Sequence, residues 1–143
     1  MVLRRQVIRA AVILLGAFAF RAAPASAEFT ADSNAIHAGP CTRTAAGRQV
    51  TLEIDPKPVK HMKELNFRVT VEPCEGLPTN LLVDLSMPGM VMGRNQVRIS
   101  KRSGCTWEGR GLIVRCMSGR TLWKATLLSP ELGNPAFTFD VRD

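Results

Sequence analysis

The sequence lacks the patterns on which most enzymes and nucleic-acid-binding proteins depend. It has no Gly-rich phosphate loop, no nucleophile elbow and no acid–His–Ser order, so an enzyme is not expected. Aromatic residues make up only 6% of the chain and are not interleaved with the basic ones, which argues against a nucleic-acid surface. A type 1 copper site needs two histidines, a cysteine and an axial methionine. One of the two histidines, His37, falls in an N-terminal leader, so that site is not expected either.

Paired cysteine motifs are also missing. The four cysteines, at positions 41, 74, 105 and 116, form no CxxC pair and no zinc-type doublet. An even number of cysteines in an exported domain most often means disulfides. We therefore expect two disulfides, and a free thiol that binds metal is the lesser alternative.

No apolar run is long enough to span a bilayer comfortably. The run over 10–20 follows Arg4, Arg5 and Arg9 and leads to the small-residue pattern Ala25-Ser26-Ala27, as in a cleaved signal peptide. We predict a signal peptide over 1–27, cleavage after Ala27 and a periplasmic or secreted protein without a retained membrane anchor. Arg4-Arg5 leaves open the twin-arginine route besides ordinary secretion. Four of the 19 Lys and Arg lie in this segment, so the mature chain has 15 against 12 acidic residues.

After an irregular leader over 28–47, hydrophobic residues alternate with polar ones in short runs, and no convincing amphipathic helix occurs. Turn residues separate the runs. Seven short strands in a domain over 48–143 predict an all-β, immunoglobulin-like antiparallel β-sandwich, with a small barrel as the alternative. The predicted strands cover 50–54, 65–71, 81–85, 97–99, 105–114, 122–128 and 137–141.

Antiparallel strand order decides which loops share an end of such a domain. The loops before 65–71, after 81–85 and after 105–114 should lie together, while Cys74 and Cys105 should meet at the opposite end. Ten extended residues span about 33 Å, so Cys105 and Cys116 are too far apart to bond across one strand. We therefore predict the disulfides Cys74–Cys105 and Cys41–Cys116. If 109–111 were a hairpin turn, Cys105 would instead face Cys116.

The most unusual feature is the segment MPGMVMG over 87–93, which places three methionines within six residues at a Pro-Gly turn. Methionine is usually a flexible filler of cores, but a turn of this kind lies at the surface. Thioether sulfur suits Cu(I), and it has no proton to lose at low pH. The sequence predicts a Cu(I) site formed by Met87, Met90 and Met92, with His61, Met62 and Met117 as auxiliary ligands.

A structural interpretation of the same segment stays open. Met87 continues the alternation of the preceding strand, so in this interpretation it faces the core and the turn is a folded cap without metal. The two hypotheses are thus a Cu(I)-binding module and a metal-free structural or interaction domain of the cell envelope.

Several segments together resemble the YtkA-like and FixH-like domains of bacterial envelope proteins. They are Met87–Gly93 after a hydrophobic strand, Trp107–Gly111, Arg115–Arg120 with Trp123, the closing strand over 137–141, and the segment over 57–62 before Leu65-Asn66-Phe67. The resemblance covers most of 50–141. It implies an immunoglobulin-like sandwich outside the inner membrane, in a group linked to copper handling or oxidase maturation. A partner would then be another envelope copper protein or an oxidase assembly factor. Unlike FixH, this chain is not expected to retain a membrane helix.

Overall fold

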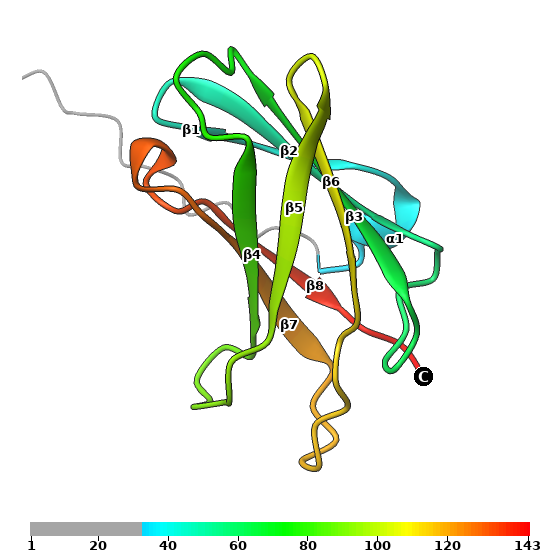
Figure 1. The fold of residues 1–143 in the computed structure, drawn as a ribbon. Helices are drawn as coiled ribbons and strands as arrows, with labels where there is room; N and C mark the ends of the chain where they lie inside the picture. Colours follow the sequence, from blue (N-terminus) through cyan, green and yellow to red (C-terminus); the bar gives the residue numbers. More distant parts are fainter. Residues whose placement is uncertain (1–32) are drawn as a thin grey trace, which may run out of the picture.

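The structure, a computed structural model, describes residues 33–143, and the predicted signal peptide and the start of the leader lie outside them. Eight antiparallel strands are hydrogen-bonded in the order β1-β2-β3-β6-β5-β4-β7-β8 and form one nearly closed sheet (Figure 1). The elements are α1 (Ala35–Ala38), β1 (Cys41–Ala45), β2 (Arg48–Asp55), β3 (Leu65–Glu72), β4 (Asn80–Ser86), β5 (Gln96–Ser103), β6 (Thr106–Gly111), β7 (Leu122–Leu128), the 3-10 helix η1 (Pro130–Leu132) and β8 (Ala136–Asp140). None of the helices between residues 33 and 143 has the length and apolarity of a membrane-spanning segment.

The core follows directly from the alternation of side chains along the strands. In β3 and β4 every second residue is buried, as the period of two requires. Two tryptophans, Trp107 and Trp123, are completely buried between the strands. The indole N–H of Trp107 donates to the Pro78 carbonyl at 3.0 Å, which satisfies its one polar atom. The all-β prediction is confirmed.

The expectation of an irregular leader over 28–47 is wrong for the part that the structure describes. Residues 35–38 form the short helix α1, and residues 41–45 form the edge strand β1 beside β2. His37 connects α1 to the 56–64 loop and to β8. Its Nδ1 accepts a hydrogen bond from the Val59 amide at 3.2 Å, and its Nε2–H donates to the Asp140 carbonyl at 2.9 Å. The strand count is therefore eight, not seven, among the described residues.

Two glycines explain how β6 and β5 approach each other. A Cβ on Gly109 would overlap the carbonyl oxygen of Arg98 in β5, and one on Gly111 would overlap the side chain of Val97. Glycine within a strand often marks such a close approach. The ladder between these strands is short and shifts register between Lys101 and Ser103. Residues 109–111 continue β6, so the alternative of a hairpin turn there is wrong.

The strand order gathers three loops at one end of the molecule, visible at the bottom of Figure 1. They span residues 56–64, 87–95 and 112–121 and are called the methionine end below. The opposite end holds the predicted disulfide between Cys74 and Cys105, whose Cα atoms are 5.5 Å apart. Strand order therefore predicts correctly which loops lie together.

Candidate metal centre at the methionine end

The segment MPGM forms a tight turn whose first residue belongs to the core. Met87 is only 2% exposed, and its carbonyl accepts the amide of Met90 at 3.2 Å. Gly89 has a φ of 72°, which is the conformation that a turn with proline before glycine needs at its third residue. The turn therefore reverses the chain just after β4 and brings Met90 back over the end of the core.

Met90 meets a cysteine from another loop. The thiol of Cys116 donates to the Met90 Sδ at 3.6 Å, and its Sγ lies 3.0 Å from the Ser118 hydroxyl oxygen. The hydrogen bonds from the Ser118 side chain and then from its backbone lower the pKa of the Cys116 thiol. Two sulfur atoms thus lie together, and one of them loses its proton more easily than an ordinary thiol.

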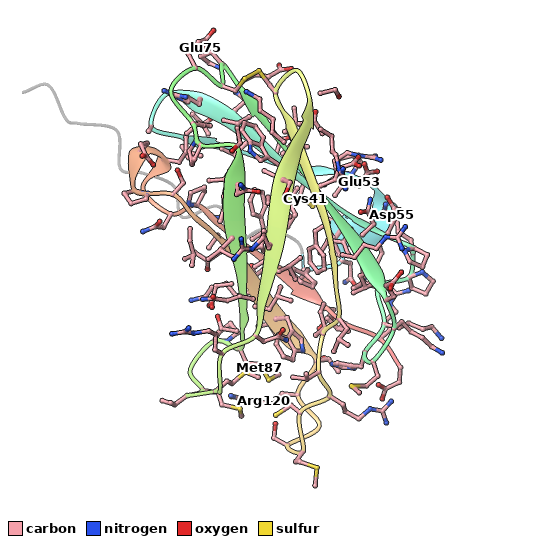
Figure 2. The ribbon with its side chains drawn as sticks, viewed as in Figure 1. Cys41, Glu53, Asp55, Glu75, Met87 and Arg120 are labelled. Carbon is pink, nitrogen blue, oxygen red and sulfur yellow. A yellow bond between two sulfur atoms is a disulfide. The ribbon has the colours of Figure 1, made fainter. Side chains whose placement is uncertain are left out.

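The other predicted methionine ligands differ in where they lie. Met92 is half-buried and, like Met90, packs against the core. Met62 is 60% exposed, and Met117 is fully exposed. Figure 2 shows Met87 and Arg120 together at this end and Glu75 at the opposite end. The structure thus brings the 87–92 loop to Cys116, while Met62 and Met117 face solvent.

His61, the predicted nitrogen ligand, is buried and hydrogen-bonded through both ring nitrogens. Its Nε2 accepts the indole N–H of Trp123 at 3.2 Å, so Nδ1 carries the proton and donates to the Asp143 carboxylate at 3.0 Å. The same carboxylate oxygen pairs with Arg115 at 3.0 Å. A metal would have to displace a buried hydrogen bond to reach this ring.

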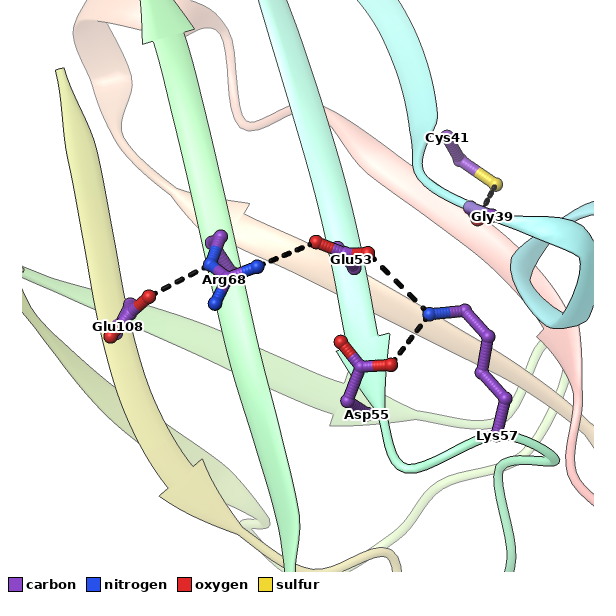
Figure 3. Close-up of polar contacts among 7 residues, drawn as sticks. All are labelled: Gly39, Cys41, Glu53, Asp55, Lys57, Arg68 and Glu108. Carbon is purple, nitrogen blue, oxygen red and sulfur yellow. Dashed lines mark hydrogen bonds and ion pairs between the residues drawn. The ribbon is translucent and has the colours of Figure 1, made fainter.

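The predicted Cys41–Cys116 disulfide is not formed. Cys41 begins β1 opposite Leu52, and its thiol points to the Gly39 carbonyl at 4.0 Å (Figure 3). Cys116 instead lies in the 112–121 loop against Met90. The prediction was wrong because the leader pairs with β2 as a strand and does not reach that loop.

Three of the six carboxylates in the described strands pair with basic residues. In Figure 3 a row of ion pairs runs across the outer face from Glu108 through Arg68 to Glu53, Lys57 and Asp55. The hydrogen bonds to Glu108 and then Glu53 raise the pKa of Arg68. Within residues 33–143 no group of three His, Cys, Asp or Glu side chains is placed to hold one metal ion.

The sequence predicted a disulfide for Cys116 and offered a free, metal-binding thiol only as the lesser alternative. The signal was available, because strand order already placed Cys116 and Met117 at the end that holds the methionine loop. Comparison of the chain with protein-family models, with curated proteins and with solved structures gives no significant match. The resemblance to YtkA-like and FixH-like domains therefore stays a prediction.

Proposed function

We propose that this protein binds Cu(I) at the methionine end, through the Cys116 thiolate and the Met90 thioether. The observation that carries the proposal is their sulfur–sulfur distance of 3.6 Å. Two sulfur ligands about 2.3 Å from one tetrahedral metal ion lie about 3.8 Å apart. The two side chains therefore need little rearrangement to share an ion, and Met92 and Met87 supply further thioethers in the same loop.

The chemistry of these groups suits a carrier better than a permanent site. Thioethers bind Cu(I) without losing a proton, whereas a thiol must be deprotonated first. The lowered pKa of Cys116 reduces the cost of that step. Cys116 is also only partly buried, so a second protein could reach a bound ion. His61 then acts as a structural residue, and Met62 and Met117 surround the site without contributing ligands.

The place and process that fit this activity are the bacterial envelope and copper handling. The basic, apolar start of the sequence supports export, and the resemblance to YtkA-like domains supports delivery to another envelope copper protein or an oxidase assembly factor. We also propose the immunoglobulin-like sandwich. Its support is the short, shifted ladder between β5 and β6, which joins β1-β2-β3-β6 to β5-β4-β7-β8.

One observation favours a second function, that of a metal-free structural or interaction domain. Met87 is buried, and Met90 and Met92 pack against the core, as expected of residues that close the open end of a sheet. The two functions make opposite predictions for a substitution that keeps the packing and removes the sulfur.

The test is an anaerobic Cu(I) titration in competition with a chromogenic chelator, with ascorbate as the reductant. Met90→Leu preserves volume, and Cys116→Ser removes the thiolate. We expect each to weaken binding by more than the about 10–100-fold that outer-shell partners are worth. Met117→Leu and Cys41→Ser are the matched controls and should bind like the wild type. Equal affinity in all five proteins would refute the copper proposal and leave the metal-free cap.

A further inference from the structure

The exposed hydrophobic residues of the described chain gather at one end. All five of the large ones lie in the loops of the methionine end or within one residue of them, while the opposite end has none among the described residues. Val91 and Met117 are fully exposed at the tips of their loops, and the other three are exposed by 41–60%. Because large side chains are usually withdrawn from water, their collection at one end indicates a surface that something covers. The five are Met62, Val91, Leu112, Met117 and Leu122.

The loops of the two ends also differ in their charged residues. The loops over 87–95 and 112–121 contain three arginines, Arg94, Arg115 and Arg120, and no acidic residue. The loops of the opposite end, over 73–79 and 129–135, contain Glu75 and Glu131 and no basic residue. Within residues 33–143, Arg94 and Arg120 form no ion pair, and Arg115 forms one with Asp143. The loops that carry the exposed apolar tips are thus basic, whereas at the opposite end the basic residues Arg48 and Lys101 lie on strands beside the 73–79 loop.

We propose that the methionine end docks on an anionic membrane surface, with Val91 and Met117 inserted among the lipid headgroups. Figure 1 shows that the two loops that carry them extend beyond the sheet, side by side at one end. Separate apolar tips among arginines suit a fluid headgroup layer. A typical protein partner would instead need about 800 Å² of continuous complementary surface, rather than separate apolar tips. This inference does not rest on the proposed copper function.

The charge sets the expected size of the effect. Each Lys or Arg close to an anionic surface strengthens binding about fivefold, so the two arginines without an ion pair, Arg94 and Arg120, predict a preference of about 25-fold for anionic over neutral vesicles. The preference should fall with salt, because exposed charges are screened within about 10 Å at 0.1 M.

The test places a tryptophan at one loop tip and reads its depth with lipids brominated on the acyl chains. Val91→Trp in the full chain is the reporter, and Met117→Trp is a second one. The native Trp107 and Trp123 are completely buried, so they contribute a constant background. Glu75→Trp, in the 73–79 loop of the opposite end, is the matched control. It also corrects for any binding through the N-terminal segment. A chelator keeps the protein free of metal, so that this test and the copper titration can fail independently.

With vesicles of phosphatidylglycerol and phosphatidylcholine, we expect Val91→Trp to shift its emission to shorter wavelength and to be quenched. Glu75→Trp should show neither effect. Adding Arg94→Ser and Arg120→Ser to the Val91→Trp protein should weaken binding by about 25-fold, and vesicles of phosphatidylcholine alone should give no quenching. Equal quenching at both ends, or quenching that ignores the arginines, would overturn the proposal. So would the absence of quenching at Val91→Trp, which would turn this end into a surface for an acidic protein.

Discussion

Replacing His61 by leucine tests the claim that this histidine is structural. The substitution keeps an apolar side chain of similar size but removes the acceptor of the Trp123 indole N–H. Trp123 is completely buried, so water does not replace that acceptor. The substitution also removes the hydrogen bond to Asp143.

The expected loss in the free energy of unfolding follows from these two hydrogen bonds. A buried donor left without an acceptor costs about 1–3 kcal/mol. The bond to Asp143 adds less than about 1 kcal/mol, because that carboxylate is 65% exposed. We expect His61→Leu to lower the free energy of unfolding by about 2 kcal/mol. For a domain of this size this corresponds to a fall in Tm of about 6–12 °C.

Urea denaturation of four proteins measures the effect: the wild type, His61→Leu, Trp123→Phe and the double variant. The double variant should be less destabilised than the sum of the single ones by about 1–2 kcal/mol, because it removes donor and acceptor together. Asp143→Ala is the control for the exposed bond and should cost less than about 1 kcal/mol. A loss below about 0.5 kcal/mol in His61→Leu would refute the structural role, and a loss of Cu(I) binding at unchanged stability would make His61 a ligand.

Three further predictions concern the strands, the disulfide and the thiol. Gly109→Ala should lower the free energy of unfolding by about 1–3 kcal/mol in urea, because the new Cβ overlaps a main-chain carbonyl of β5. Replacing Cys74 and Cys105 by alanine should cost about 3–4 kcal/mol, because the bond closes a loop with a sequence separation of 31. Ser118→Ala should slow alkylation of Cys116 by iodoacetamide near pH 7. The substitution removes the side-chain hydrogen bond, which is the largest cause of the lowered pKa, so the pKa of Cys116 rises and less thiolate is present.

Each of these predictions has a control in the same chain. Gly93→Ala meets nothing within 4 Å and should leave stability unchanged, so an equal loss in both alanine variants would contradict the close approach of β5 and β6. The variant with Cys74→Ala and Cys105→Ala should have the same free energy of unfolding with and without dithiothreitol, because it has no Cys74–Cys105 bond to reduce. The alkylation rate of Cys41 should not respond to Ser118→Ala, and the difference at Cys116 should vanish at a pH where both proteins are fully thiolate.

The strands could be predicted because their signal is local. Alternation of apolar and polar residues depends on the geometry of a single strand, and five of the predicted runs, together with 106–111 and 137–140 of the other two, lie in β2–β8. β1 has no such signal, since its residues CTRTA are half-buried or exposed throughout. It becomes a strand only by pairing with β2.

The candidate site was predictable in place but not in composition. Strand order puts the methionine loop and Cys116 at one end, since successive antiparallel strands must alternate in direction. Which side chains then touch depends on loop conformation. His61 is hydrogen-bonded to Trp123 and Asp143, which are 62 and 82 residues away. No spacing in the sequence predicts these two contacts.

The sequence by itself determined the all-β class, the Cys74–Cys105 bond and the loops that share an end, because side-chain period and strand direction are properties of short segments. Only the tertiary structure decided that Cys116 meets Met90 rather than Cys41 and that His61 supports Trp123. These contacts join residues distant in the chain, and they are fixed by the packing of loops and edges against a completed core.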